Sequence, residues 1–329
     1  MKLLDFDELA AFITRNRQKK VAITFHSIGD RDGVSSAISL ASYFPRSTVI
    51  TPDYLTGNAK RMLRQAGYSD AIKASMPTGT ELLIIMDTNM LESIGELGIR
   101  AREANCQMLF VDHHLLPANI KSSEGIIFND EGYNSTASII YALLKRVEAK
   151  ITKGMAILLV NGIISDSAEL QNSTYITFMQ ISELLEMASM DYADVIELMH
   201  DNISPKGRYT IINEIKDSEI EIVGKYIFIH GKAVLHANVA ADIAIRIGAD
   251  ASLFWTVAKK EASVSARLRA PLDKRLRMHL GVLMQEVGVM LNGNGGGHPC
   301  AAGAYGPLKD NINAAASKAE EGIKKRLLQ

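Results

Sequence analysis

Short apolar runs alternate with helical patterns through the first half of the chain, and this alternation limits the fold more than any other feature. The runs are rich in Val, Ile and Leu, and they do not show the strict apolar–polar alternation of a strand with one wet face. Strands of this kind are buried on both faces, as in a parallel sheet covered by helices. The runs that we expect to be strands are 21–26, 48–51, 82–87, 107–112 and 125–128.

The second half of the chain has a different order, in which strands are followed by helices. Its predicted elements are a hairpin at 219–224 and 225–231, a helix at 238–248, strands at 253–260 and 261–270, and helices at 276–291 and 310–328. Such an order is typical of a smaller α+β domain.

The two halves are expected to be separate domains. Helical patterns at 35–43, 135–149 and 153–165 belong to the first, whereas 187–216 is mostly helical and contains Pro205 and Gly207. We therefore predict an α/β fold with a parallel-sheet domain, a helical linker and a smaller α+β domain, and a cleft between the domains. The predicted boundaries are 1–186, 187–216 and 217–329.

Composition excludes several other classes of protein. With 47% hydrophobic and 22% charged residues and no biased tract, the chain is neither disordered nor fibrous. Its two cysteines, Cys106 and Cys300, cannot form a disulfide framework or a four-thiolate zinc site. The first residues lack the build of a signal peptide, and the apolar stretch 155–164 is too short to span a bilayer. We expect a cytoplasmic protein without membrane contact.

The net charge of −1 hides an asymmetry between the two halves. Lys216 to the C-terminus holds 16 Lys+Arg against 11 Asp+Glu, a balance of +5, while the first 215 residues hold 20 against 26. An acidic half joined to a basic half suits a metal site facing a surface that holds phosphate. When only the charges are considered, ordinary variation of surface charge explains this asymmetry equally well.

Acidic and histidine side chains follow the predicted strands at the point where each strand ends. They are His26, Asp30 and Asp32 after the first strand, Asp87 at the end of the third, and Asp112, His113 and His114 at the end of the fourth. In open α/β sheets, ligands bind at the carboxyl ends of the strands, so these side chains are expected to converge.

Each fragment taken alone has a plain structural explanation. Asp30–Gly33 is typical of a turn, and Asp87 suits the cap of a following segment. An Asp-His-His triplet occurs by coincidence in many proteins. The occurrence of all three, in order and at strand ends, favours a functional site.

Together these motifs resemble those of the DHH phosphoesterases. The segments that carry the resemblance are His26–Gly33, Asp87, Asp112–His114 and Gly162–Asp166. Downstream, Gly295–Gly303 and Ser265–Arg267 resemble the DHH-associated domain found with many of these enzymes. The sequence departs from the common pattern in two places. Arg31 stands where many members have a small residue, and Ser167-Ala168 after Asp166 replaces the more usual Thr-Gly.

The resemblance implies two divalent metal ions, Mn²⁺ or Mg²⁺, at these motifs. One ion would be held by His26, Asp30 and Asp87, and the other by Asp32, His113 and Asp166, with Asp87 bridging the pair. Carboxylate and imidazole ligands without thiolates suit these ions better than structural zinc. The resemblance also implies that His114 contacts the phosphate or assists the leaving oxygen, while Asp112 orients the motif.

A substrate-binding role is expected for the downstream motifs. Backbone amides at Gly296 and Gly297 can approach an anion closely, and His298 adds a donor. A flexible loop is the alternative for this glycine-rich segment. For Arg267 the alternative is a solvated charged face, and the resemblance favours phosphate binding.

The resemblance implies a metal-dependent phosphodiesterase, and we expect an exonuclease on single-stranded or short nucleic acid, similar to the RecJ-like enzymes. The alternatives are a nanoRNase that also acts on 3′-phosphoadenosine phosphate and a cyclic-dinucleotide phosphodiesterase. Inorganic pyrophosphatases of this type resemble the chain only in its first domain. A non-catalytic replication or repair scaffold is expected to lose metal ligands, and here every ligand position named above is present.

The expected partners are single-stranded DNA or RNA, or short oligonucleotides. Aromatic residues make up 6% of the chain and Trp255 is the sole tryptophan, so a long stacking platform is not evident. This favours the binding of a strand end. A homodimer and docking on a repair or replication protein stay open at this point.

Overall fold

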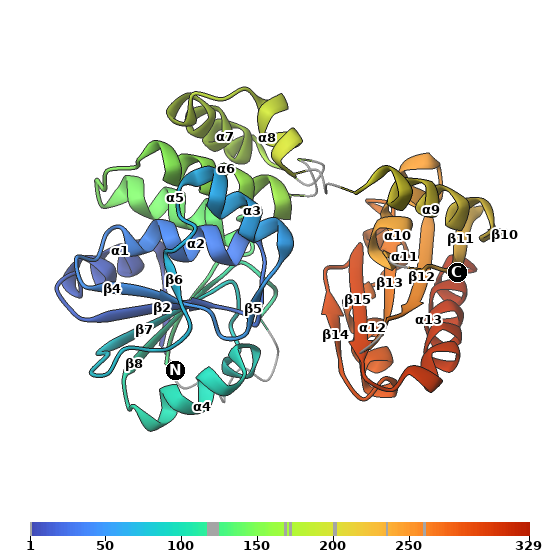
Figure 1. Ribbon diagram of the computed structural model, residues 1–329, viewed down its shortest axis with the longest axis horizontal. Coiled ribbons are helices and arrows are strands. Elements are labelled where there is room, and N and C mark those ends of the chain that lie inside the picture. Colours follow the sequence, from blue (N-terminus) through green and yellow to red (C-terminus); the bar gives the residue numbers. More distant parts are fainter. Residues whose placement is uncertain are drawn as a thin grey trace. The chain divides into compact units, whose positions relative to one another are not determined.

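The structure is a computed structural model of the 329-residue chain, and it describes residues 2–116, 125–167, 170, 173–199, 203–234, 236–258 and 261–329 (Figure 1). The chain forms two compact units, unit 1 (Met1–Asp201) and unit 2 (Asn202–Gln329), and the boundary falls inside the expected connector. Residues 200–202 of that connector, and Lys259 and Lys260 of a predicted strand, lie outside the described residues. No helix in the described ranges is long and apolar enough to cross a membrane.

Unit 1 is built on a seven-stranded sheet in which every pair is parallel, which confirms the predicted fold class. In spatial order the strands are β1 (Lys2–Leu4), β9 (Ile126–Asn129), β8 (Gln107–Asp112), β7 (Leu82–Met86), β2 (Val21–Phe25), β4 (Ser47–Ile50) and β6 (Ile72–Lys73). A separate parallel pair joins β3 (Ile28–Gly29) and β5 (Tyr54–Leu55). The sequence does not predict β1 or β6, because edge strands of three and two residues are too short to show an apolar run.

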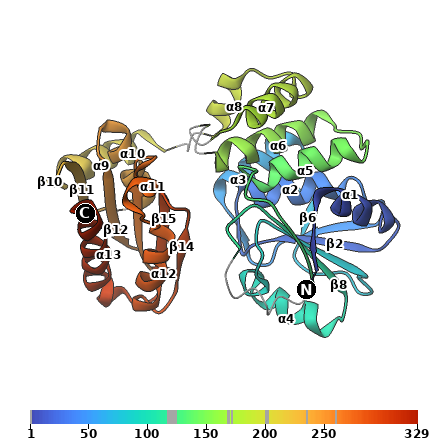
Figure 2. The ribbon, with the colours of Figure 1, turned by 180° about the vertical axis from the view of Figure 1, so that it is seen from behind.

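Helices cover both faces of this sheet (Figures 1 and 2). They are α1 (Phe6–Arg15), α2 (Arg31–Ala41), α3 (Gly57–Ala66), the 3₁₀ turn η1 (Leu91–Ile94), α4 (Glu96–Glu103), α5 (Thr136–Arg146), α6 (Lys153–Asp166), α7 (Tyr175–Ala188) and α8 (Tyr192–Met199). Helices α2, α5 and α6 pack together on one face, α4 lies on the other, and α7 packs against α6.

The central strand β7 shows why the apolar runs are continuous. Successive side chains of a strand point to opposite faces. Leu82, Ile84 and Met86 lie in the core shared with α2, α5 and α6, whereas Leu83 and Ile85 lie in the core shared with η1 and α4. All five side chains are fully buried, so a polar residue at any of these positions would lose its hydration.

Helix α2 begins at Arg31, four residues earlier than the sequence predicts. Asp30 is its N-cap, and the Asp30 Oδ1 accepts a hydrogen bond of 3.0 Å from the Gly33 N–H. The segment that resembles a turn is therefore the cap and first turn of the helix. The prediction was wrong because Asp and Gly favour both turns and helix starts.

Unit 2 contains a six-stranded mixed sheet. In spatial order its strands are β10 (Glu219–Val223), β11 (Tyr226–Lys232), β12 (Ala251–Val257), β13 (Ala262–Leu268), β15 (Ala301–Gly306) and β14 (Asn294–Gly297). Only the β11–β12 pair is parallel. The predicted hairpin is confirmed as β10–β11, and the two predicted strands are confirmed as β12 and β13.

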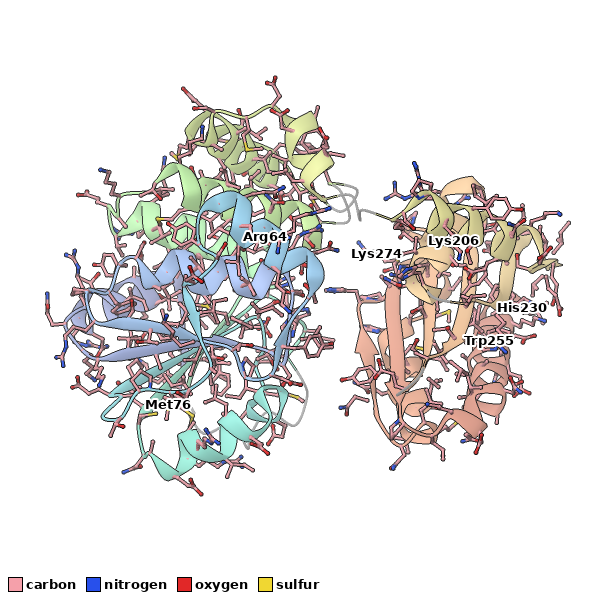
Figure 3. All side chains as sticks on the ribbon, in the orientation of Figure 1. Arg64, Met76, Lys206, His230, Trp255 and Lys274 are labelled. Atoms are coloured by element: carbon pink, nitrogen blue, oxygen red, sulfur yellow. The ribbon has the colours of Figure 1, made fainter. Side chains whose placement is uncertain are left out.

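Helices also cover both faces of the unit 2 sheet. They are α9 (Pro205–Lys216), α10 (Ala237–Ile247), α11 (Leu272–Leu276), α12 (Leu280–Met290), the 3₁₀ turn η3 (Lys309–Asn311) and α13 (Ile312–Leu327). Ile229 and Phe254 lie in the core beneath α10, whereas Phe228 and Leu253 lie in the core beneath α12 and α13. The predicted helix 276–291 is interrupted at Arg277, whose φ of 48° ends α11. Figure 3 labels His230 and Trp255 on the strands of this sheet.

The glycine-rich segment forms the edge strand β14 rather than a flexible loop. A Cβ atom on Gly288 of α12 would lie 2.4 Å from the carbonyl carbon of Asn294, and one on Gly295 would lie 1.8 Å from the carbonyl oxygen of Met284. Helix α12 and strand β14 are therefore in direct backbone contact, which only glycine permits. Gly296 is different, because no atom lies within 4 Å of its Cβ position.

We predict that Gly288→Ala destabilises the protein while Gly296→Ala does not. The added methyl at Gly288 must separate α12 from β14, which costs about 1–3 kcal/mol for overpacking. The methyl at Gly296 enters open space and should change stability by less than about 0.5 kcal/mol. Urea unfolding followed by circular dichroism measures both variants, and equal stabilities would contradict the proposed backbone contact.

Candidate metal centre

The structure brings together all six residues that the sequence names as metal ligands. Their ligand atoms form two groups, within each of which all atoms lie within 4.8 Å of one another. The first group is His26, Asp30 and Asp87, and the second is Asp32, Asp87, His113 and Asp166. Asp87 belongs to both groups, as expected of a bridging ligand.

The first group lies where β2 and β7 end. His26 Nε2 is 3.3 Å from Asp30 Oδ2 and also 3.3 Å from Asp87 Oδ2. Asp87 has a φ of 62°, a left-handed conformation that non-glycine residues seldom adopt. Its N–H still donates to the Val111 carbonyl at 2.9 Å, so this residue turns the chain directly after the last paired position of β7.

The second group is centred on the His113 side chain. His113 Nε2 lies 3.2 Å from Asp166 Oδ2, 3.6 Å from Asp87 Oδ1 and 3.8 Å from Asp32 Oδ2. These carboxylates come from three separate elements: the end of α6, the end of β7 and the first turn of α2. The parallel sheet brings them together because β2, β7 and β8 are neighbours with aligned carboxyl ends.

The N-terminus of α5 holds two of these acids, and the sequence does not predict this contact. Asp32 accepts hydrogen bonds from the Thr136 N–H at 2.7 Å and the Ala137 N–H at 2.8 Å. The Thr136 hydroxyl donates to Asp87 Oδ1 at 3.1 Å. Free N–H groups at a helix start stabilise anions. The available signal was Ser135-Thr136 at the start of the predicted helix, but its partner acids are about 50 and 100 residues away.

Asp166 is the last residue of α6, where an acid is unfavourable because the helix dipole places negative charge at that end. Its position is therefore explained by the site and not by helix stability. One turn earlier, a Cβ on Gly162 would lie 2.3 Å from Ser35 Oγ and 3.3 Å from Asp32 Oδ1. Gly162 thus lets α6 pack closely on α2 and brings Asp166 beside Asp32.

The clustered charges alter the acidity of each other. Burial, together with the charges of Asp87 and Asp166, raises the pKa of Asp32 well above its usual range. Burial also raises the pKa of Asp166 to about 6. Burial alone would raise the pKa of Asp87, but the hydrogen bond from His26 and the neighbouring histidines hold it below its usual range.

The histidines of the centre favour their charged forms. Burial disfavours the imidazolium of His26, but the hydrogen bonds and charges of Asp30 and Asp87 raise its pKa well above its ordinary value. The pKa of His113 is also raised, because Asp166 and Asp87 outweigh the effects of burial and of His114. A metal ion bound to these ligands would therefore displace protons from the histidines.

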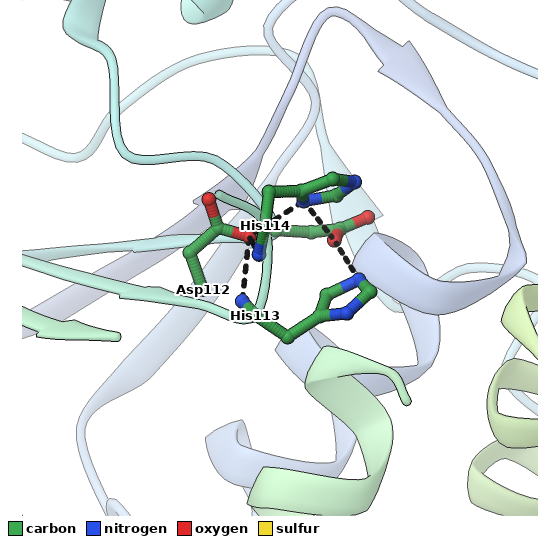
Figure 4. A group of neighbouring side chains, drawn as sticks. Asp112, His113 and His114 are labelled. Carbon is green, nitrogen blue, oxygen red and sulfur yellow. Dashed lines mark hydrogen bonds and ion pairs between the residues drawn. The ribbon is translucent and has the colours of Figure 1, made fainter. Parts of the chain in front are cut away.

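Asp112 orients the histidine pair (Figure 4). Its buried Oδ1 accepts hydrogen bonds from the His113 N–H at 2.8 Å and the His114 N–H at 3.3 Å, and lies 2.8 Å from His114 Nδ1. Burial opposes the charged form of His114, but Asp112 and Asp87 raise its pKa to about 9. This geometry agrees with the orienting role expected for Asp112, while the catalytic role of His114 stays a prediction.

The residues present fit divalent metal ions. The Asp30 side chain is 39% exposed, and the side chains of the other three acids are 13% exposed or less. The ion-pair partners of these acids in the described structure are histidines. Buried carboxylates at this spacing repel one another unless protons or cations neutralise them. Oxygen and imidazole donors without sulfur suit Mn²⁺ or Mg²⁺. Each group offers three or four protein ligands, fewer than the six that these ions usually take.

Arg31, one of the two departures from the family pattern, binds a distant helix end. It is 8% exposed, and its Nη2 donates to the Met199 carbonyl at 2.7 Å. Arg61 of α3 donates to the neighbouring Leu198 carbonyl. The two guanidinium groups thus satisfy the last carbonyls of α8, which a helix leaves unpaired. A residue between two metal ligands thereby ties the centre to the last helix of unit 1.

In unit 2, the predicted substrate-binding residues lie at one end of the sheet. Arg267 of β13 pairs with Ala301 of β15, and the His298 N–H donates to the Ala301 carbonyl at 2.8 Å. Gly296 and Gly297 are the last two residues of β14, and His298 follows them directly. Arg267 also lies 3.6 Å from Asp242 of α10, and burial lowers its pKa. Phosphate binding by these four residues stays a prediction.

Two family models match the chain. Residues 20–163 match the DHH family, N-terminal domain, and residues 223–325 match the DHHA1 domain. An uncharacterized protein of Methanocaldococcus jannaschii is 27% identical over 98% of this chain and 94% of its own. A probable manganese-dependent inorganic pyrophosphatase of Streptococcus pyogenes is 27% identical over 53% of this chain, and the match spans about half of that relative, 53%.

The fold also has a close structural counterpart. An exopolyphosphatase-related protein of Bacteroides fragilis aligns over 98% of this chain and 97% of its own, with a TM-score of 0.77 and 19% identity. A paired carboxylate–histidine centre at the edge of a parallel sheet, followed by a DHHA1 domain, defines a class of metal-dependent phosphoesterases. The chain belongs to the DHH phosphoesterase family and is a hydrolase of this class.

We predict that Mn²⁺ affinity rises with pH from about 6 upward, because Asp166 has a pKa of about 6 and the pKa values of His26 and His113 are also raised. Each of these groups must release its proton before it can bind metal, so affinity is lost as the pH falls. Calorimetric titration in buffers of different ionisation enthalpy measures the released protons. In the Asp166→Asn variant, the change in Mn²⁺ affinity near pH 6 should be absent. A Mn²⁺ affinity of the wild-type protein that does not depend on pH would contradict the assignment of these ligands.

Proposed function

We propose that the protein is an exonuclease that hydrolyses phosphodiester bonds at one end of single-stranded or short nucleic acid. The observation that carries the reaction type is the position of Asp87, which belongs to both ligand groups. A shared carboxylate holds two divalent ions close together, as two-metal phosphodiesterases require for in-line displacement at phosphorus.

The side chains of unit 1 supply orientation and proton handling. When bound, the two ions provide a water of lowered pKa and neutralise charge on the phosphoryl group. Asp112 holds His114 through Nδ1, so contact with a phosphate oxygen or with the leaving oxygen falls to Nε2. The hydrogen bond that His114 Nδ1 donates to Asp112 stabilises the imidazolium, the form that donates a proton.

Unit 2 supports nucleic acid as the substrate class. Lys216 to the C-terminus has a charge balance of +5, which favours a polyanion over a small nucleotide. Arg267, Gly296, Gly297 and His298 at one end of its sheet are proposed to bind substrate phosphate groups. Aromatic residues make up only 6% of the chain, so binding of a strand end is favoured over stacking along a tract.

Inorganic pyrophosphate is the second candidate substrate. It is supported by the likeness to a probable manganese-dependent inorganic pyrophosphatase over 53% of this chain. Very short oligonucleotides, 3′-phosphoadenosine phosphate and cyclic dinucleotides are further substrates for which the same centre is suited. A homodimer and a repair or replication partner are proposals that rest on the family resemblance.

We predict Mn²⁺-dependent, stepwise shortening of end-labelled single strands, both DNA and RNA, of up to about 20 nucleotides. Pyrophosphate, polyphosphate, a cyclic dinucleotide and 3′-phosphoadenosine phosphate are assayed in parallel under the same conditions. Cleavage confined to dinucleotides would replace the proposal with a nanoRNase, and release of phosphate from pyrophosphate alone would replace it with a pyrophosphatase. The labelled end reports the polarity.

We predict that Asp87→Asn lowers kcat by more than about 100-fold and reduces the number of bound Mn²⁺ ions, because it removes the ligand common to both groups. Asn tolerates a positive φ, so this change removes the charge with little added strain at the φ of 62°. Asp70→Asn, an exposed acid of unit 1, is the matched control and should keep full activity. Normal turnover by the Asp87→Asn variant at saturating Mn²⁺ would exclude the bridging role.

A further inference from the structure

Unit 2 contains a basic cavity that is separate from the residues assigned so far. It has a volume of about 540 Å³ and lies between α13, α12 and the residues that precede α12. Its charged lining residues are Arg277, Lys318, Lys325, Arg326 and Glu286. Four cationic side chains against one carboxylate make it suitable for an anion with more than one negative charge.

The positive charge of this cavity is only partly neutralised by the protein. Lys318 lies 3.2 Å from Glu286, and Arg326 donates to the side-chain amide oxygen of Gln329. Within the described residues, no carboxylate lies within 4 Å of Arg277, Lys325 or Arg326. The neighbouring Lys324 is different, because it is 2.7 Å from Glu221 and 2.8 Å from Glu320. Of the α13 cations that line the cavity, Lys325 and Arg326 therefore have no carboxylate partner among the described residues.

Apolar residues also line the cavity. Val282 and Leu283 of α12 line it beside Gly322 of α13. A Cβ on Gly322 would lie 2.7 Å from Leu283 Cδ1, so glycine at this position makes room for the leucine side chain. A bare phosphate needs no apolar surface, whereas a nucleotide combines an anionic phosphate with a base and a sugar. The lining therefore favours a nucleotide unit over inorganic phosphate.

The cavity adjoins the glycine-rich turn through the start of α12. His279 lines the cavity, and its Nδ1 is buried without a hydrogen-bond partner in the described structure. The next residue, Leu280, donates its N–H to the Pro299 carbonyl at 3.1 Å. A Cβ on Gly281 would lie 2.1 Å from the Gly297 carbonyl oxygen, so the backbones touch here. A nucleic-acid strand bound at Gly296–His298 would thus lie beside the cavity.

We propose that this cavity binds a nucleotide unit beyond the first two of a single strand whose end is held for hydrolysis, with the phosphate on Arg277, Lys325 and Arg326. The inference rests on the proposed exonuclease function and adds to it a site that makes affinity depend on strand length. A dinucleotide lacks the unit that the cavity is proposed to bind, so its affinity should not depend on the cavity.

The test compares Lys325→Gln/Arg326→Gln with a charge-matched control, Lys216→Gln/Lys232→Gln. Gln has a helix propensity similar to that of Lys and Arg, so α13 should keep its stability. Lys216 and Lys232 are exposed residues of unit 2 that do not line the cavity. Fluorescence anisotropy in EDTA measures binding of labelled single-stranded 12-mers and dinucleotides to the full chain without turnover.

We expect the cavity variant to bind the 12-mer about 10-fold more weakly and the control within about 2-fold of wild type, with dinucleotide binding unchanged. The plot of the logarithm of the association constant against the logarithm of salt concentration should become less steep, by roughly 0.7 for each lost phosphate contact. Equal weakening in both variants, or no weakening in either, would overturn the proposal. Displacement of the 12-mer from the cavity by tripolyphosphate at equal phosphate concentration would also overturn it, because a polyphosphate site would then suffice.

The outcome separates this proposal from the proposed function. If wild-type protein binds the 12-mer through the cavity but hydrolyses no strand in Mn²⁺, the nuclease assignment fails and the binding site stands. If it shortens the 12-mer and the cavity variant keeps the wild-type KM and salt slope, the cavity proposal fails and the nuclease assignment stands.

Discussion

The mutual repulsion of the buried carboxylates around Asp87 is the constraint on which the rest of unit 1 depends. Asp32, Asp87 and Asp166 lie within 4.8 Å of one another and of His113, which is tolerable only with compensating positive charge. The structure supplies part of this compensation through the amides at the start of α5 and through the histidines. Divalent cations supply the remainder. The same closely spaced carboxylates therefore lower the stability of the fold without metal and provide the affinity for metal.

A second constraint, the close approach of backbones, organises unit 2. Gly281 and Gly288 of α12 meet the glycines of β14 at distances that leave no room for a Cβ. This contact fixes β14, the strand that carries Gly296 and leads into His298. At the start of α12, the Leu280 N–H also donates to the Pro299 carbonyl, next to His298. The glycine-rich motif therefore has a structural role in addition to its proposed contact with phosphate. Because Gly296 alone among Gly295–Gly297 has open space at its Cβ position, it is the residue of this strand that packing leaves uncrowded for the proposed contact with phosphate.

In the proposed function, the two units divide the chemistry between them. The ligand set of unit 1 is suited to hydrolysis of a phosphate ester in general, and its likeness to a probable manganese-dependent inorganic pyrophosphatase agrees with that breadth. Selection among phosphate esters must then come from groups outside the ligand set. Unit 2 offers Arg267, the β14 turn and the basic cavity for this purpose. Arg31 adds a physical link in unit 1, since it joins the ligand-bearing turn of α2 to the end of α8.

The sequence by itself determined the parallel sheet, its two-sided burial and the six ligand positions. The sheet follows from continuous apolar runs, and five of the ligands stand at or just after the ends of those runs. Asp166 ends a helix, and only the resemblance of Gly162–Asp166 to a family motif identified it. Tertiary structure alone decided the contacts that position those ligands, such as Thr136 on Asp87 and Arg31 on Met199, because their partners lie 49 and 168 residues apart in the chain. It also decided that Asp30–Gly33 starts a helix and that the glycine-rich segment is a strand. In both places the local residues are compatible with two conformations, and packing against α5 or α12 selects between them.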